Sequence, residues 1–206
     1  MKNDIIKPIS SEGVHETVLE LIFNKKGKVL DAAAGQGFLS KILLERGFEV
    51  YPVDINTSQF SYGRLECQAV DLNKQLPFED NFFDFIISVE TIEHLENPWH
   101  FIRELNRVLK NEGQLIITTP NVTNIFSRAL FLTNGRYVLF SKRDVQNKYH
   151  ITPLPMWILE GILEREGFKT EIITCSKGYI PLFKKYFKTK ELLLGHVLIV
   201  SARKIK

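Results

Sequence analysis

Three aspartates close three successive apolar stretches of the chain, and a turn of small residues follows the first of them. The first stretch and its turn read VLDAAAGQG over residues 29–37, while Asp54 and Asp71 close the next two stretches. Small residues let a ligand approach the backbone closely, and the helix expected after the turn offers free N–H groups. A carboxylate at Asp54 can accept hydrogen bonds from two ribose hydroxyls, and Asp71 is placed to meet the amino edge of an adenine. The pattern predicts a nucleoside site.

The type of nucleoside follows from Asp31 and Ser40. A dinucleotide fingerprint needs a glycine at the position of Ser40, and it usually has no acid at the position of Asp31. A carboxylate at Asp31 would repel a pyrophosphate. It would instead help to hold the ammonium group of a cationic amino-acid nucleoside, directly or through water.

A second group of reactive side chains is Glu90-Thr91-Ile92-Glu93-His94, which follows the fourth apolar stretch. If this segment forms a helical turn, Glu90, Glu93 and His94 share one face. They could then hold Mg²⁺ or a similar divalent ion, or His94 could act as a base. Alternatively, the group only shapes the loop and caps the next helix. His150 is a second candidate base, and its alternative role is a hydrogen bond to nearby backbone.

Short apolar strands alternating with helical patterns must position these residues. We expect strands at residues 28–32, 49–54, 66–70, 82–88, 114–118, 170–174 and 196–202, and helices at 37–46, 98–109 and 153–166. Residues 111–113 should stop the second helix, and Thr152 should cap the third, with Pro153 in its first turn. The alternation predicts a Rossmann-like α/β fold, in which a seven-stranded, mostly parallel sheet has helices on both faces and one antiparallel strand near the C-terminus.

Composition narrows the class of protein. The 206 residues are 44% hydrophobic and 25% charged, which is ordinary for one globular domain and argues against a disordered or fibrous chain. No apolar run approaches the about 20 residues of a membrane-spanning helix, and residues 1–9 lack the apolar stretch of a signal peptide. Cys67 and Cys175 are expected to be reduced packing residues. We therefore expect a single cytoplasmic domain over residues 1–206.

Two basic segments interrupt the alternation. Residues 121–150 carry a net charge of +4 and residues 177–190 one of +5, which leaves −6 on the rest of a +3 chain. Residues 121–150 are expected to form a lid insertion. In residues 177–190, Phe183, Tyr186 and Phe187 alternate with lysines at helical spacing, which predicts a basic amphipathic segment. Such segments can lie on an anionic membrane surface, close over an anionic substrate, or simply present a solvated basic face.

Several stretches together resemble the class I S-adenosylmethionine-dependent methyltransferases. VLDAAAGQGFLS resembles their first motif, with Ala33 at a position that is usually of glycine type. DLNKQLPFEDNFFDFIISVETIEHLENP resembles the third and fourth strands, RELNRVLKNEGQLIITTPN the following helix and fifth strand, and HITPLP…LEREGF a later helix. The match runs from about residue 28 to residue 168. The Glu90, Glu93 and His94 group resembles a pattern in the ubiquinone-pathway O-methyltransferases, some of which bind a divalent metal.

The resemblance implies S-adenosyl-L-methionine as cofactor, S-adenosyl-L-homocysteine as product, and a set of contacts. Asp31 would hold the ammonium end, and the turn would meet the methionine part through Gly35, Gly37 and the backbone around Ala33. Asp54 would bind the ribose. Adenine would be contacted by Ile55, Asp71 and Leu72, and the region near the reacting methyl would be lined by Ser88 and Val89.

The expected function is therefore methyl transfer to a small-molecule acceptor, with O-methylation favoured and with His94 or His150 as base. The basic segments suggest an anionic or lipid-linked acceptor such as a glycan, or a quinone precursor. Since no nucleic-acid module signature occurs, a nucleic-acid acceptor is not expected. The alternatives are an NAD(P)-dependent oxidoreductase and a non-catalytic cofactor-binding or interaction protein. The sequence predicts neither the acceptor's identity nor the oligomeric state.

Overall fold

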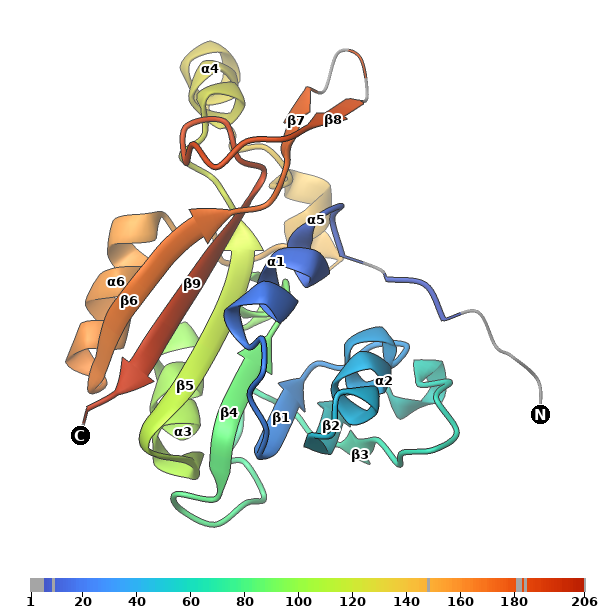
Figure 1. The fold of residues 1–206 in the computed structure, drawn as a ribbon. Coiled ribbons are helices and arrows are strands. Elements are labelled where there is room, and N and C mark those ends of the chain that lie inside the picture. The colour runs from blue at the N-terminus through green and yellow to red at the C-terminus, as the bar shows by residue number, and fades with distance from the viewer. Residues whose placement is uncertain (1–5, 9, 148, 181–182, 184, 206) are drawn as a thin grey trace.

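A seven-stranded sheet forms the centre of the molecule (Figure 1). The computed structural model describes residues 6–8, 10–147, 149–180, 183 and 185–205. Across the sheet the strand order is β3-β2-β1-β4-β5-β9-β6. The strands are β1 (Lys28–Ala32), β2 (Glu49–Asp54), β3 (Gln68–Ala69), β4 (Phe83–Ser88), β5 (Leu109–Pro120), β6 (Phe168–Cys175) and β9 (Val197–Lys204). β1 to β5 pair in parallel, and β9 is antiparallel to both β5 and β6. The predicted Rossmann-like sheet with one antiparallel strand is confirmed.

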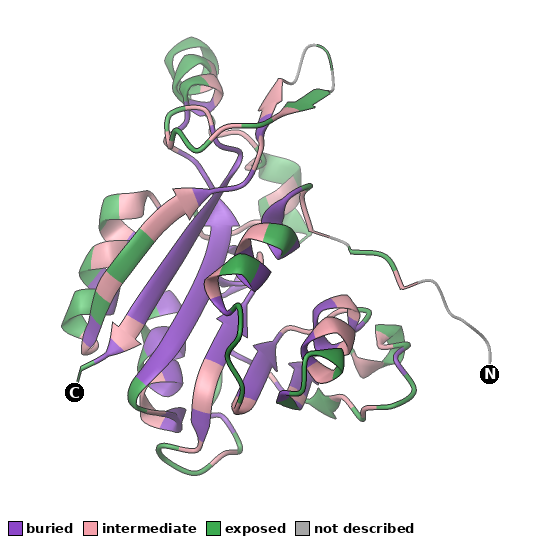
Figure 2. Ribbon diagram, viewed as in Figure 1, coloured by how far each residue is buried: buried purple, intermediate pink, exposed green. Residues whose placement is uncertain are grey.

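Helices cover both faces of the sheet. In Figure 1, α1 (Val14–Leu21) and α2 (Phe38–Glu45) lie on the near face, and α3 (Pro98–Val108) and α6 (Met156–Arg165) lie on the far face. Each face has its own hydrophobic cluster. The near cluster includes Val18 and Leu43, and the far cluster includes Phe101, Leu105 and Leu159. Figure 2 shows β5 and β9 buried along most of their length, as expected for strands covered on both sides.

Two helix boundaries differ from the expectation. α6 begins at Met156 rather than at Pro153, and the Thr152 hydroxyl donates to the Leu95 carbonyl (2.6 Å) instead of capping the helix. The physical reason is Pro155, since a residue before proline disfavours the helical conformation. α3 ends at Val108 and β5 follows at once, so residues 111–113 lie within the strand segment and do not stop the helix.

The expected amphipathic helix in residues 177–190 is wrong for the described part of that segment. β7 (Gly178–Ile180) and β8 (Lys185–Phe187) pair as an antiparallel hairpin, in which Tyr179 lies opposite Tyr186. A Cβ at Gly178 would lie 2.2 Å from the Phe187 ring, so the close pairing requires glycine there. The spacing of aromatic residues that suggested a helix instead serves a cross-strand aromatic pair. Lys184 lies outside the described residues.

The other insertion leaves the sheet at the carboxyl end of β5. It contains α4 (Ile125–Asn134) and α5 (Lys142–Gln146), and Figure 1 shows α4 and the β7–β8 hairpin at the same end of the molecule. α4 is largely exposed (Figure 2). Two short 3₁₀ turns, η1 (Thr57–Gln59) and η2 (Ile92–His94), follow β2 and β4. No helix within the described residues is long and apolar enough to cross a membrane.

Candidate functional site

A cavity of about 1070 Å³ lies at the carboxyl ends of β1, β2 and β4. This edge is where open α/β sheets bind ligands. Eight of the ten predicted cofactor residues line it, namely Asp31, Ala33, Gly35, Asp54, Ile55, Asp71, Leu72 and Val89. Glu90, His94 and His150 line the same cavity. The fold therefore brings the two groups of reactive residues that the sequence singled out into one space.

The glycine turn is held to the end of β2 by Asp54. Its carboxylate accepts the Gly35 N–H at Oδ2 and the Asn56 N–H at Oδ1, both at 2.9 Å. Ala33 has φ 69°, a conformation that costs a non-glycine residue about 1 kcal/mol. Its N–H donates to the Val53 carbonyl at 2.9 Å, which helps to hold that conformation. The alanine at this usually glycine-type position is thus accommodated, and it lines the cavity.

Gly37 and Ser88 are the two predicted cofactor residues that are not on the cavity wall. Gly37 caps α2 with φ 87°, and a Cβ there would lie 2.7 Å from the Phe60 ring. Ser88 is fully buried at the end of β4. The geometry gives Gly37 a role in the turn and in packing, while direct cofactor contact by either residue remains a prediction.

Asp31 is an almost fully buried carboxyl group, with 2% of its surface exposed. The Ser40 hydroxyl donates to it at 2.5 Å. Burial raises the pKa of Asp31 to about 6, and the nearby charge of Asp54 adds to the rise. No ion pair to Asp31 occurs within the part of the chain that the structure describes. A cationic ligand in the cavity would relieve the cost of this buried charge.

The far end of the nucleoside region is formed by Asp71, Leu72 and Ile55. Asp71 accepts the Asn73 N–H at 3.0 Å, and this bond lowers the pKa of Asp71, so that the carboxylate stays ionised. Leu72 is buried, whereas Ile55 is 74% exposed. An exposed aliphatic side chain beside the cavity is available to pack on the face of a planar base.

Two imidazoles lie at the other end of the cavity. The ring centroids of His94 and His150 are 4.9 Å apart. The Nδ1 of His94 lies 2.7 Å from the Tyr149 carbonyl, and that of His150 lies 2.7 Å from the Leu139 carbonyl. Because a carbonyl only accepts, both Nδ1 atoms carry the proton, and both Nε2 atoms keep a lone pair in the neutral rings. Burial lowers the pKa of His94, which favours its neutral form.

Glu93 lies behind the cavity wall, at the same end of the cavity as the two histidines. Its side chain is fully buried, and neither carboxyl oxygen makes a hydrogen bond to the described residues. Burial raises the pKa of Glu93 to about 8, and the nearby charge of Glu90 adds to the rise. The Glu93 backbone N–H and the Thr119 hydroxyl act in the opposite direction, although neither makes a hydrogen bond to the carboxyl group. The Glu93 carbonyl accepts the N–H groups of Ile151 and Thr152, both at 2.9 Å. These two bonds bring the end of the insertion, including His150, against η2.

The predicted Glu90, Glu93 and His94 face is wrong in one member. Glu90 has φ 46°, and the 3₁₀ turn begins only at Ile92, so Glu90 does not share its face. The Glu90 carboxylate instead accepts the backbone N–H of Ser11 at 2.8 Å and the Ser11 hydroxyl at 3.1 Å. His150 takes the place of Glu90, since one Glu93 oxygen and one nitrogen each from His94 and His150 lie within 4.8 Å of one another.

Sequence reasoning missed part of the wall. Tyr179 and Tyr186 of the hairpin line the cavity beside His196, and their rings are 4.9 Å apart. The aromatic residues of residues 177–190 were visible in the sequence, but their helical interpretation hid this role. The N-terminal segment contributes Ser11 and His15, and burial lowers the pKa of His15 to about 4.

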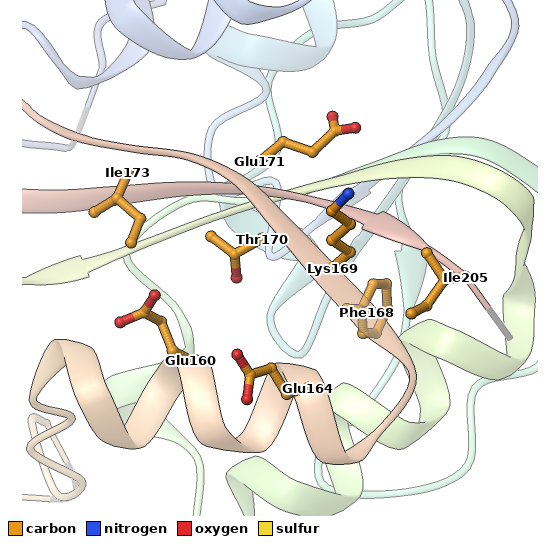
Figure 3. A pocket seen from close by; sticks show the side chains of 8 residues that line it. All are labelled: Glu160, Glu164, Phe168, Lys169, Thr170, Glu171, Ile173 and Ile205. Atoms are coloured by element: carbon orange, nitrogen blue, oxygen red, sulfur yellow. The ribbon is translucent and has the colours of Figure 1, made fainter.

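A second hollow of about 520 Å³ lies between α6 and β6, one of the two edge strands of the sheet. Figure 3 shows Glu160 and Glu164 on α6 reaching toward β6, with Thr170 facing the helix and Lys169 and Glu171 pointing away. The hollow has no imidazole, thiol or glycine turn among its lining residues. We therefore place the candidate active site in the larger cavity.

Comparison with known proteins agrees with this geometry. Residues 30–117 match a family described as "Methyltransferase domain". A protein of Mycolicibacterium smegmatis described as a probable S-adenosylmethionine-dependent methyltransferase is 26% identical over 164 residues, covering 76% of this chain and 58% of that protein. Residues 30–117 therefore form a methyltransferase domain, and the relatives and solved structures that this chain resembles include proteins described as S-adenosylmethionine-dependent methyltransferases. The cofactor of this methyltransferase family is S-adenosylmethionine.

This chain also resembles a curated enzyme and a solved structure. The ubiquinone biosynthesis O-methyltransferase of Acinetobacter baumannii is 25% identical over 170 residues, covering 78% of this chain and 70% of the enzyme. The crystal structure of an S-adenosylmethionine-dependent methyltransferase from Archaeoglobus fulgidus aligns with a TM-score of 0.69 at 21% identity, covering 92% of this chain and 94% of that one. That likeness concerns the fold. The chain spans little more than half the length of its M. smegmatis relative.

Proposed function

We propose that this protein transfers a methyl group from S-adenosylmethionine to a hydroxyl group of a small-molecule acceptor. The observation that carries the proposal is the buried Asp31 carboxyl, which has no cation partner among the described residues and lies on the wall of the cavity beside the glycine turn. The ammonium group of the cofactor supplies the missing positive charge. A pyrophosphate would instead meet Asp31, Asp54 and Asp71, three carboxylates in one cavity.

The remaining cofactor contacts follow from groups with free hydrogen-bonding capacity. Each Asp54 oxygen accepts one backbone N–H and keeps a second lone pair for a ribose hydroxyl. Asp71 accepts the adenine amino group, and Ile55 and Leu72 pack on the base. Val89 lies near the reacting methyl. The cavity volume exceeds the roughly 300–1,000 Å³ of ordinary small-molecule pockets, which leaves room for an acceptor beside the nucleoside.

Methyl transfer from a sulfonium is an in-line displacement, so alignment and exclusion of water provide most of the acceleration. The acceptor oxygen forms a bond to the methyl carbon while the carbon–sulfur bond breaks, and its electron pair returns to sulfur. A neutral hydroxyl must also lose its proton. Because Nδ1 of His94 and of His150 faces a backbone carbonyl, the Nε2 atom of either ring in its neutral form can accept this proton, and we assign the two histidines to this step.

A negatively charged acceptor would place its charge outside the cavity. Lys7 is the one lysine or arginine among the described lining residues. The exposed basic residues that the structure describes in the two segments lie outside the cavity lining, namely Arg128, Arg136, Lys142, Arg143, Lys185, Lys188 and Lys190. Residues 121–150 act as a lid, because Val138, Leu139 and Tyr149 line the cavity. Leu132 is 85% exposed and Phe183 is 65% exposed beside these charges, which suits an anionic lipid-linked acceptor at a membrane surface. The name of the A. baumannii relative supports a hydroxyl acceptor, such as a quinone precursor.

Release of S-adenosylhomocysteine in the presence of candidate acceptors tests the proposal. Phenolic quinone precursors and lipid-linked anionic glycans would be compared with neutral glycans and with acceptor-free controls. We expect turnover that depends on a hydroxyl acceptor, that is lost in Asp54→Ala, and that falls for lipid-linked acceptors in Lys185→Glu. An NAD(P)-dependent oxidoreductase would reduce or oxidise its substrate with nicotinamide instead. Tight binding of S-adenosylhomocysteine without turnover on any acceptor would favour a non-catalytic binding protein.

A further inference from the structure

One wall of the cavity is an aromatic surface to which methyl transfer assigns no role. Tyr179 and Tyr186 lie opposite each other in the β7–β8 hairpin, with ring centroids 4.9 Å apart. The His196 ring lies 5.1 Å from the Tyr179 ring and 6.3 Å from the Tyr186 ring, and all three residues line the cavity. A backbone bridge between Gly178 and Gly195 joins the hairpin to the residue before His196. The three rings therefore form one aromatic surface.

His196 is a buried polar member of this surface that lacks a partner. Its residue is 7% exposed, and its ring makes no hydrogen bond within the described part of the chain. Burial lowers the pKa of His196, which favours the neutral ring. A buried polar group without a partner is costly, so a ligand that forms a hydrogen bond with the ring would offset this cost. Because His196 lines the cavity, we expect that ligand inside it.

Glu90 provides negative charge beside the aromatic surface. Its carboxylate lines the cavity, and each oxygen accepts one hydrogen bond from Ser11, which leaves each a second lone pair. Burial raises the pKa of Glu90, while the bonds from Ser11 and the charge of His150 act in the opposite direction. Burial also raises the pKa of Tyr186, and the charges of Tyr179 and Glu90 add to that rise. Glu90 therefore lies near both the histidine pair and the hairpin.

The balance of charge in the cavity favours a cation at this place. The described lining includes one lysine, Lys7, and five carboxyl groups, on Asp31, Asp54, Asp71, Glu90 and Glu96. In the proposed function the three aspartates meet the cofactor. Glu90 remains at the end that the acceptor enters, and no lysine or arginine forms a salt bridge with it among the residues that the structure describes.

We propose that the aromatic surface and Glu90 bind a positively charged nitrogen of the acceptor, which is then a hydroxyl compound with an amino or quaternary ammonium group. Aromatic faces attract a cation within about 6 Å of the ring centroid, and more strongly where water is excluded. Glu90 supplies the counter-charge, and the unprotonated nitrogen of His196 can accept an N–H. This inference rests on the proposed function. A protonated or quaternary nitrogen has no lone pair, so the hydroxyl stays the nucleophile.

The cation subsite and the basic segments select opposite ends of one molecule. The subsite lies on the wall of an acidic cavity, whereas exposed basic residues such as Lys185 and Lys188 lie outside the cavity lining. An acceptor with an amino group at one end and a phosphate at the other, such as a lipid-linked amino sugar, would enter with its cationic end first.

The test uses choline, which has a hydroxyl and a quaternary ammonium group, and the neutral alcohol in which carbon replaces its nitrogen. Binding of each probe to the full chain is measured by NMR titration, with and without S-adenosylhomocysteine. Tyr179→Leu removes one aromatic face, and Tyr137→Leu is the matched control because Tyr137 stacks on Phe131 and is not among the lining residues. Glu90→Gln removes the counter-charge. Its control is Ser11→Ala, which loses the hydroxyl bond to Glu90 but keeps the charge.

We expect choline to bind about tenfold more tightly than the neutral alcohol. Its affinity should fall about fivefold in Tyr179→Leu and in Glu90→Gln and should not change in the two controls. Equal affinity of the wild type for the two probes, or equal losses in the variants and their controls, would overturn the cation subsite. S-adenosylhomocysteine binding by each variant reports separately on the fold.

The outcome for the proposed function is distinguishable. If the probes bind equally but a hydroxyl acceptor without a cationic group is methylated, the proposed function stands and the cation subsite does not. Conversely, a protein that binds choline through Tyr179 and Glu90 but does not bind the thioether would support the subsite and contradict the proposed function.

Discussion

Asp31 is predicted to lower the stability of the free protein while it binds the cofactor. Its pKa is raised by burial from 3.8 to about 6, which corresponds to about 3 kcal/mol. Because the folded state holds the proton more tightly than the unfolded state, this contribution to stability is complete below pH 3.8 and is lost as the pH rises through 6. At pH 7 the ionised, buried carboxylate therefore costs the folded state up to about 3 kcal/mol.

The variant Asp31→Asn removes that charge and keeps the shape. Its amide oxygen can still accept from the Ser40 hydroxyl, so the expected gain in unfolding free energy at pH 7 is up to about 3 kcal/mol, with little gain near pH 4. Urea denaturation at pH 4, 5, 6 and 7 measures the difference. Asp84→Asn is a control with the opposite sign, since Asp84 pairs with Lys110 at 2.7 Å and its neutralisation should destabilise the protein at pH 7.

The same variant should bind the cofactor poorly. S-adenosylhomocysteine carries the ammonium group that an ionised Asp31 would hold, so wild-type affinity should fall about tenfold between pH 7 and pH 5. The affinity of Asp31→Asn should be lower at pH 7 and nearly independent of pH. The reasoning is refuted if Asp31→Asn is less stable than the wild type at pH 7, or if both proteins show the same pH dependence of binding.

Three further predictions concern the frame around the site. Gly37→Ala should lower the unfolding free energy by about 1–2 kcal/mol, because φ is 87° and a Cβ would lie 2.7 Å from the Phe60 ring. Gly63→Ala is the control, since a Cβ there meets open space and should change the unfolding free energy little. Urea denaturation measures both variants. Arg107→Met should lower the unfolding free energy by about 2 kcal/mol, since the Arg107 guanidinium bonds two carboxylates and two carbonyls. Arg103 is exposed and bonds one carboxylate, so an equal loss in Arg103→Met would contradict this explanation. Glu90→Gln replaces the carboxylate that accepts both hydrogen bonds from Ser11 with a weaker acceptor, so the backbone amides of residues 10–15 should exchange with solvent faster. Unchanged hydrogen exchange would show that these two bonds do not hold the N-terminal segment in place.

The centre of the sheet was predictable because β1, β4 and β9 are buried along most of their length and are therefore largely apolar runs. β2 has the predicted bounds, and Asp54 at its end has the predicted place on the cavity. Local patterns failed where a non-local contact decides the structure. Thr152 has the type of a helix cap, but its hydroxyl donates to Leu95, 57 residues away. The β7–β8 hairpin likewise depends on a cross-strand contact between Tyr179 and Tyr186. The spacing of the aromatic residues in the sequence fits a helix equally well.

The candidate site was predictable in part for the same reason. Asp31 and Asp54 lie at the carboxyl ends of β1 and β2, and Asp71 comes shortly after β3, so the order of the strands gathers them at one edge. His150 lies 56 positions after His94, and the hydrogen bonds between the end of the insertion and residues 93–95 bring the two histidines together. The positive φ of Glu90 is equally invisible in the sequence, and it is the reason that Glu90 leaves the predicted cluster.

Calorimetric titration of the purified wild-type protein with S-adenosylhomocysteine, and separately with NADH, tests the central claim most directly. A cavity built around Asp31, Asp54 and Asp71 for a cationic nucleoside predicts one thioether molecule bound per chain with micromolar affinity and no heat from NADH. Binding of NADH without binding of the thioether would contradict the account and move the protein to the oxidoreductases.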